Sequence, residues 1–242
     1  MTVLNAAEYN NIELLKRLDE LTNDNIEIIN VNGERYIGCG LKKKNLIIRG
    51  TAGNNLAAFS EEIRIALYGN GQEGVANTMS DGEIIVHGRV GDIAGYAMRG
   101  GCLYIRDDVG YRLGIHMKSY QDKKPVIVVG GSVGAFAGEY MAGGIIIVLG
   151  LNKYQPLIGH YCGTGMYAGS IYLRGEFDLR NIAANVKIET VDAEQMAQII
   201  VYLEQFSNYF GYSLEKILTE PFTRLSMKVK RPFAHLYTGF VS

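Results

Sequence analysis

Short aliphatic runs recur along this chain about every nineteen residues, and glycine-rich sequence follows each of them. In each run, two positions separated by one residue are aliphatic in all seven copies. The first position is Leu46, Ile65, Ile84, Leu103, Ile127, Ile146 and Ile171, and the second is Ile48, Leu67, Val86, Ile105, Val129, Val148 and Leu173. Because residues two apart in a strand point to the same side, the pattern predicts seven short strands that share one apolar interior.

The position between these two should point away from that interior, yet it is also apolar. We call this set the middle row: Ile47, Ala66, Ile85, Tyr104, Val128, Ile147 and Tyr172. A continuous apolar row on an outer surface needs a cover. The cover is either this chain's own terminal helices or another subunit, and both alternatives are open at this point.

Small residues follow each aliphatic run at fixed offsets. The glycines that define the repeat are Gly88, Gly91, Gly95, Gly131, Gly134, Gly138 and Gly150. A chain that turns a corner every few residues needs backbone freedom and little side-chain bulk. We therefore expect these glycines to be structural residues of the corners.

Methionine recurs at one position of the repeat, three residues after a glycine or alanine. This set is Met79, Met98, Met117 and Met141. Cys162 takes the same position in the next copy if a two-residue insertion is allowed. Thioether side chains fill irregular gaps in apolar cores, so we expect a methionine ladder in the core rather than a copper or haem site.

One nineteen-residue unit cannot bury its own apolar side, so the copies must stack. We predict a mainly β fold: a right-handed parallel β-helix of about seven coils with N- and C-terminal helical caps. Right-handedness follows the general rule for parallel crossovers. A left-handed helix of the acyltransferase type is disfavoured, because it requires an aliphatic residue at every sixth position.

The sequence outside the repeats has helical periodicity near both ends. Leucines at helical spacing in 5–21 and apolar residues at helical spacing in 192–206 predict amphipathic helices. We therefore expect an N-terminal helix and capping segment in 1–44, the β-helix in 45–180, and C-terminal helices and a tail in 181–242. Together they should form one structural domain.

Composition excludes several classes of protein. The net charge of −1 provides no field that would attract nucleic acid or an anionic membrane, and no apolar run approaches the roughly 20 residues of a membrane span. The N-terminus does not resemble a signal peptide. Three cysteines, far apart in sequence, suggest reduced thiols. We expect a cytoplasmic protein with no nucleic-acid or membrane partner.

No residue pattern indicates catalysis. His87, His116 and His160 occupy different positions of the repeat, so nothing in their spacing brings them together. Each glycine-rich segment leads to another strand, which does not satisfy the dinucleotide fingerprint. Cys162 is explained more simply as a buried thiol than as a nucleophile. We therefore predict no catalytic, cofactor-binding or metal-binding residue in this chain.

Several joined segments resemble one known family. They are NVNGERYIGCGL, GTAGNNLAAF, GRVGDIAGYAMRGGCLYIRDDVGYRLGIHMK and VIVVGGSVGAFAGEYMAGGIIIVLG. These segments are similar to the GXGXG domain of glutamate synthase, and most similar to the stand-alone domain 3 subunit found where the large subunit is split. The same domain type occurs as one of the subunits of formylmethanofuran dehydrogenase, which is the alternative.

The resemblance implies a right-handed β-helix with no known active site. In that family the domain is thought to brace the glutamine amidotransferase domain against the synthase domain, which carries FMN and an iron–sulfur cluster. The complex converts glutamine and 2-oxoglutarate to two glutamates. The implied role here is a non-catalytic scaffolding subunit, with FMN and the cluster on partner subunits. A homo-oligomer and, from another class, an independent carbohydrate-acting enzyme remain alternatives.

Overall fold

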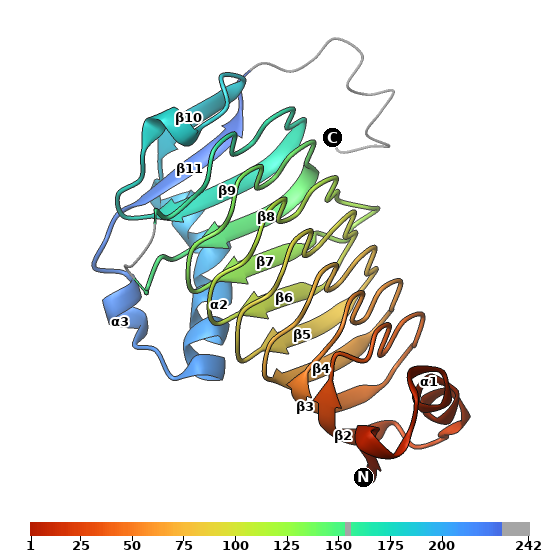
Figure 1. The fold of residues 1–242 in the computed structure, drawn as a ribbon. Coiled ribbons are helices and arrows are strands. Elements are labelled where there is room, and N and C mark those ends of the chain that lie inside the picture. The colour runs from red at the N-terminus through yellow and green to blue at the C-terminus, as the bar shows by residue number, and fades with distance from the viewer. Residues whose placement is uncertain (153–155, 229–242) are drawn as a thin grey trace.

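The computed structural model of the protein describes residues 1–152 and 156–228, and the tail predicted beyond residue 228 lies outside that description. Eleven strands form one sheet that runs the length of the molecule (Figure 1). The strands are β1 (Thr2–Asn5), β2 (Asn25–Asn32), β3 (Asn45–Thr51), β4 (Ile63–Tyr68), β5 (Gly82–Val86), β6 (Cys102–Ile105), β7 (Val126–Val129), β8 (Ala142–Val148), β9 (Ala168–Arg174), β10 (Val186–Thr190) and β11 (Phe222–Met227). The helices are η1 (Ala6–Glu8), α1 (Asn11–Glu20), η2 (Leu179–Asn181), α2 (Ala193–Phe210) and α3 (Leu214–Ile217).

The sheet is mostly parallel and follows the chain. Its order is β1-β2-β3-β4-β5-β6-β7-β8-β9-β11-β10, and every neighbouring pair from β1 to β9 is parallel. β11 then pairs antiparallel with β9, and β10 pairs antiparallel with β11. A further repeat precedes residue 45, because β2 pairs in parallel with β3. Segments on both sides of 45–180 thus contribute strands to the same sheet.

The prediction of a right-handed parallel β-helix of about seven coils with helical caps is wrong. The structure is one curled, mixed sheet with two antiparallel strands at its far edge. The segments that return from one strand to the next form no further ladders. They are turns joined by isolated bridges, such as those linking Ala52, Gly71 and Val90. Nor does α2 cap an end, because it lies along one side of the sheet (Figure 1).

The return segments are irregular because left-handed residues alternate within them. In each repeat three positions, two residues apart, have φ between +49° and +76°. The first left-handed column is Tyr36, Asn55, Gly74, Ile93, Arg112, Phe136 and Tyr161; the second is Gly38, Ala57, Ala76, Gly95, Gly114, Gly138 and Gly163; the third is Gly40, Phe59, Thr78, Ala97, His116, Tyr140 and Gly165. Such alternation is incompatible with an extended strand.

The alternation makes successive N–H groups point to opposite neighbours. The Asn55 N–H donates to the Glu73 carbonyl of the following repeat (2.8 Å), whereas the Ala57 N–H donates to the Ile37 carbonyl of the preceding one (2.8 Å). Each return segment is therefore hydrogen-bonded on both sides, as the strands are. This arrangement satisfies the backbone polar groups of a segment that is neither helix nor strand.

Only a small residue fits the second left-handed column. A Cβ built on Gly95 would lie 2.4 Å from the Cδ1 of Ile127, and one on Gly138 would lie 2.6 Å from the Cδ1 of Ile171. The column thus faces the aliphatic side chains of later strands.

The interior of the curled sheet is the main core, and it is built as the aliphatic pattern predicts. All fourteen aliphatic positions are buried, and they pair in register from β3 to β9, as Leu46 with Ile65 and Ile65 with Ile84 show. The four predicted ladder residues, Met79, Met98, Met117 and Met141, are fully buried in the same cluster. From α1, Leu14 and Leu18 join this cluster at the N-terminal end.

The next member of the methionine column is Met166, not Cys162. The Gly163 N–H donates to the Ala137 carbonyl as the Gly138 N–H donates to the Leu113 carbonyl, so Gly163 occupies the second left-handed column. Met166 follows Gly163 by three residues, as Met141 follows Gly138. The insertion in this repeat is longer than the two residues assumed from sequence.

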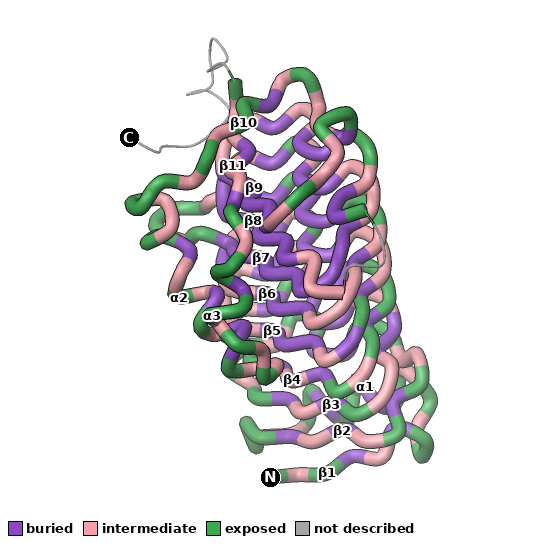
Figure 2. Tube along the Cα trace, turned by 90° about the vertical axis from the view of Figure 1, so that its left-hand side faces the viewer, coloured by how far each residue is buried: buried purple, intermediate pink, exposed green. Residues whose placement is uncertain are grey.

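A second core lies between α2 and the outer side of the sheet. From the helix, Ile199, Leu203 and Phe206 are fully buried against the middle row from Ile85 to Tyr172. The chain's own helix therefore covers the row over β5 to β9. In Figure 2 buried segments continue through these strands, while residues at both ends of the molecule are more exposed.

Candidate functional site

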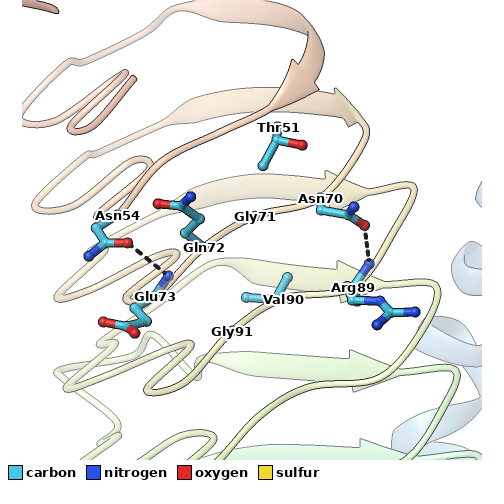
Figure 3. A pocket seen from close by; sticks show the side chains of 9 residues that line it. All are labelled: Thr51, Asn54, Asn70, Gly71, Gln72, Glu73, Arg89, Val90 and Gly91. Carbon is cyan, nitrogen blue, oxygen red and sulfur yellow. Dashed lines mark hydrogen bonds between the residues drawn. The ribbon is translucent and has the colours of Figure 1, made fainter. Parts of the chain in front are cut away.

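An open pocket with a mixed polar and apolar lining lies near the carboxyl ends of β3 and β4, with a volume of about 530 Å³ (Figure 3). Its lining residues are Thr51, Asn54, Asn70, Gly71, Gln72, Glu73, Arg89, Val90 and Gly91. The carboxyl ends of parallel strands are where open sheets commonly bind ligands. The pocket is therefore a candidate binding site.

Several polar side chains of the pocket are used by the scaffold itself. The Asn54 Oδ1 accepts a hydrogen bond from the Glu73 N–H (3.3 Å), and the Asn70 Oδ1 accepts one from the Arg89 N–H (3.0 Å; Figure 3). The same contact recurs further along, where the Asp108 Oδ1 accepts from the Ser132 N–H (2.8 Å). These side chains join each repeat to the next rather than reaching for a ligand.

The remaining lining groups offer hydrogen bonds but no catalytic pair. Glu73 is the only carboxylate among the lining residues, whereas glycoside hydrolysis generally uses two. Glu73, Arg89 and Gln72 are exposed, so water surrounds them and no low-dielectric site forms. The residues that line the pocket therefore supply no acid–base pair.

The three candidate histidines lie in aromatic contacts with three different tyrosines. The His87 ring stacks on Tyr68 with centroids 4.5 Å apart and meets the edge of Phe210 at 5.1 Å. Burial and the nearby Arg106 lower the pKa of His87. His116 stacks on Tyr140, and His160 lies beside Tyr161. Within 1–152 and 156–228, no group of three or more His, Cys, Asp or Glu residues is arranged to hold a metal ion.

Neither the buried Cys162 nor the half-buried Cys102 has the environment of a nucleophile. Burial raises the pKa of the fully buried Cys162 thiol to about 12 and that of Cys102 to about 11. Both thiols therefore stay protonated at neutral pH, and only a thiolate attacks readily.

A polar cluster under α2 was not anticipated from the sequence. The Tyr104 hydroxyl donates to the Gln205 side chain, and the Tyr209 hydroxyl donates to the Glu83 Oε1 at 2.7 Å. Burial is the main cause that raises the pKa of Tyr209 to about 12, so its phenol remains a donor. Gln205 and Tyr209 are four residues apart on α2, so they lie on the same face of the helix. This spacing is the sequence signal that could have placed both side chains against the sheet. Their role is to hold α2 on the sheet.

The predicted repeat glycines outside the second column lie at corners between strands and return segments. They are Gly88, Gly91, Gly131, Gly134 and Gly150. A Cβ on any of the first four would contact atoms of the preceding repeat, between 2.2 and 3.2 Å away at the nearest. The structure thus gives these residues a place in the packing between repeats.

A group of aromatic and charged side chains on three successive return segments also escaped the sequence analysis. We call it the aromatic cluster: Arg112, His116, Phe136, Tyr140 and Tyr161. The Arg112 guanidinium lies 5.3 Å from the Phe136 ring centroid, Phe136 stacks on Tyr161 (5.1 Å, 22°), and His116 stacks on Tyr140 (5.3 Å, 13°). The cluster offers contact area and hydrogen-bond donors.

Among the described residues, no helix has the length and apolar character needed to span a bilayer.

Comparison with known proteins identifies the class to which this architecture belongs. The family model for the GXGXG motif matches residues 25–231, so the chain belongs to the GXGXG motif family. It is 39% identical to an uncharacterized protein of Methanocaldococcus jannaschii over 98% of this chain and 96% of that protein. It is also 27% identical to the ferredoxin-dependent glutamate synthase of spinach chloroplasts over 72% of this chain.

These comparisons confirm the resemblance to the GXGXG domain of glutamate synthase. This chain, however, spans only a small part of the length of those enzymes. The match covers only 12% of the spinach enzyme, and a 30% identical match to the enzyme of Antithamnion covers 9% of that protein. Among solved structures, a chain of the formyltransferase/hydrolase complex of Methylorubrum extorquens, in complex with methylofuran, has a TM-score of 0.63 at 23% identity. That match covers 84% of this chain and 73% of the other, and it shows a shared fold.

Proposed function

We propose that this chain is a non-catalytic scaffolding subunit of a glutamate synthase-type complex, which converts glutamine and 2-oxoglutarate to two glutamates. In this proposal it braces a glutamine amidotransferase subunit against a synthase subunit in the cytoplasm. FMN and an iron–sulfur cluster belong to the synthase subunit, and this chain carries neither. It needs no nucleic-acid or membrane partner.

The observation that carries the proposal is the match of most of this chain to one domain of a much larger enzyme. The chain matches a small part of the much longer glutamate synthases, and nearly the whole of its Methanocaldococcus jannaschii relative. Among its described residues, the pocket lacks an acid–base pair, and the raised pKa values of Cys102 and Cys162 keep both thiols protonated. Chemistry is then expected on other chains.

The architecture suits a brace. Each return segment is hydrogen-bonded to both neighbours, and the interior is continuous from β1 to β9. Ammonia released at one active site reaches a second site only if the two are held in a constant relation and shielded from water. A stiff, continuous sheet provides that constancy.

The test is affinity capture of the tagged full chain from native cells, followed by mass spectrometry and assay of the captured material. We expect an amidotransferase chain and an FMN/iron–sulfur synthase chain in constant ratio to the bait, together with glutamine-dependent glutamate formation. Capture of the bait alone, as a stable folded protein, would contradict the proposal.

A second candidate is a subunit of a complex of the formylmethanofuran dehydrogenase type. The fold similarity over 84% of this chain favours it. The same capture experiment separates the two candidates, because the second predicts co-purification of formyltransferase/hydrolase-type chains and no glutamate formation.

A further inference from the structure

The last strand of the sheet, β10, has one open edge. The strand order ends β9-β11-β10, so β11 pairs with one edge of β10, and no strand of the described residues pairs with the other (Figure 1). All five residues of β10 pair with β11 in one continuous register, without a bulge. A regular edge of this kind is a template for a further strand.

The backbone groups that face the open edge follow from the hydrogen bonds to β11. The Val191 N–H donates to the Phe222 carbonyl at 3.2 Å, which continues the register of the two strands. In an antiparallel pair, residues that exchange hydrogen bonds alternate with residues that do not. The odd-numbered residues of β10 therefore bond to β11. The N–H and C=O groups of Ile188 and Thr190 point away from the sheet, toward the open edge.

Ile188, in the middle of β10, is a core residue that lacks a cover on one side. Ile171 pairs in register with Leu225, and Leu225 pairs with Ile188, so Ile188 continues the first aliphatic position of the repeats. Ile171 and Leu225 are fully buried, whereas Ile188 is 43% exposed. A strand added at the open edge would bury this side chain, which favours the addition.

The features that usually protect a solitary edge are missing from β10. Natural edge strands commonly carry a proline, a bulge or a charge that points inward. The residues on the interior side of β10 are Val186, Ile188 and Thr190, and none of them is charged. The charged residues Lys187 and Glu189 lie on the opposite side, where they pair with each other at 2.7 Å. The edge can therefore accept another strand.

The sequence of β10 is complementary to a second copy of itself. In an antiparallel pair centred on Ile188, the two Ile188 residues exchange backbone hydrogen bonds, and each Thr190 N–H reaches the Val186 carbonyl of the other copy. Lys187 of each copy then lies opposite Glu189 of the other, which is a favourable cross-strand pair. Sliding one copy by two residues would place Glu189 opposite Glu189, or Lys187 opposite Lys187. The charges, although paired within each chain, therefore select one register.

We propose that β10 pairs with β10 of a second copy of this chain around a two-fold axis at Ile188, so that two sheets join into one. The same surface is used on both copies, so the contact closes and yields a dimer rather than a filament. The dimer is a property of this chain alone and is tested separately from the scaffolding role. It adds to that role by joining two scaffolds edge to edge.

The test is sedimentation of the purified full chain over a series of concentrations. Lys187→Glu and Glu189→Lys each place like charges opposite one another in the proposed pair, and a mixture of the two variants restores opposite charges at both contacts. The matched control is Lys42→Glu, which removes an exposed ion pair of similar length, Lys42–Glu61 at 2.8 Å, away from β10. Ile188→Pro removes the N–H that faces the open edge, at a position where an edge strand tolerates proline.

We expect a wild-type dimer that dissociates on dilution. Lys187→Glu and Glu189→Lys should each weaken it by at least about tenfold, because each change acts twice across the axis, and their mixture should return to within about threefold of the wild type. Lys42→Glu should dimerise as the wild type does, and Ile188→Pro should be a folded monomer. Glu189 also accepts a hydrogen bond from the Ser226 hydroxyl at 2.9 Å, so circular dichroism checks that each variant is folded. If Glu189→Lys is not folded, Lys187→Glu and Ile188→Pro decide the outcome.

Three results would overturn the proposal. The first is a wild type that is monomeric at every concentration, which is expected if another segment of the same chain covers the edge. The second is a dimer that Lys187→Glu and Ile188→Pro leave unchanged. The third is assembly that grows beyond two copies as the concentration rises, which would indicate a contact between two different surfaces.

Discussion

Substitution of Gly95 by alanine tests the packing of the second left-handed column. The new Cβ would lie 2.4 Å from the Cδ1 of Ile127, and the residue would keep φ near +68°. The left-handed conformation costs alanine about 1 kcal/mol, and overpacking a filled core costs about 1–3 kcal/mol more. We therefore expect the free energy of unfolding to fall by about 2–4 kcal/mol.

Two further variants separate the conformational cost of the left-handed backbone from the cost of overpacking. Gly40 has φ +69°, and a Cβ added there would meet nothing within 4 Å, so Gly40→Ala should lose only the conformational part, about 1 kcal/mol. Ile127→Val removes the methyl group that obstructs the new Cβ, at a cost of about 0.5–1.5 kcal/mol by itself. Combined with Gly95→Ala, it should lose about 1–2 kcal/mol less than the sum of the two single changes.

Urea unfolding followed by circular dichroism measures these differences, since the chain has no tryptophan. With a slope on the order of 3 kcal/mol per molar, a loss of 3 kcal/mol moves the midpoint by about 1 M. Additivity of Gly95→Ala and Ile127→Val within about 0.5 kcal/mol would refute the steric reasoning. So would equal losses for Gly95→Ala and Gly40→Ala.

Three other outcomes are expected. Arg174→Met should loosen α3 and lower the free energy of unfolding by about 2–4 kcal/mol, because the buried guanidinium donates to the carbonyls of α3, among them Ile217 at 2.6 Å. Hydrogen exchange of the α3 amides should become faster, and unchanged exchange would contradict this. Arg180 lowers the pKa of Asp178 to about 2, so this pair stabilises the fold above the unfolded pKa of about 3.9, and that stability is lost as pH falls through 2. Asp178→Asn should therefore lower Tm at neutral pH by a small amount, because the pair is exposed, and should leave Tm unchanged below about pH 2. A thiol reagent should label the exposed Cys39 in the native protein and Cys162 only after unfolding, and early labelling of Cys162 would refute its burial.

The aliphatic positions and their register could be predicted because they follow a simple physical rule. A residue such as Ile65 or Val86 must alternate with an outward residue, and a one-residue slip would expose the whole set. The return segments could not be predicted in the same way. Residue type does not signal a left-handed backbone at Phe59 or Tyr140, so the pattern wrongly predicts regular coils of a β-helix there.

Other features depended on contacts that no local pattern encodes. The length of the insertion before Gly163 decides whether Cys162 or Met166 joins the methionine column, and only the hydrogen bond to Ala137 identifies it. β10 was not predicted, because Val186 is its only buried residue and the strand pairs antiparallel with β11 rather than with a neighbouring repeat.

The candidate surfaces were equally hidden from local patterns. The members of the aromatic cluster are spread from Arg112 to Tyr161, and they become neighbours only when three repeats stack in register. By contrast, the expectation of no catalytic residue rested only on the observation that His and other reactive residues do not recur at one position of the repeat. That expectation stays a prediction.

The two-sided bonding of the return segments has a consequence for how such a protein changes length. A repeat can be added or removed only as a whole, since a partial one would leave donors on one neighbour and acceptors on the other without partners. Each whole repeat changes the length of the sheet by one strand spacing, about 4.8 Å. Insertions such as residues 118–124 alter the outline without altering that spacing. The distance between the two ends of the sheet can therefore change only by whole multiples of this strand spacing.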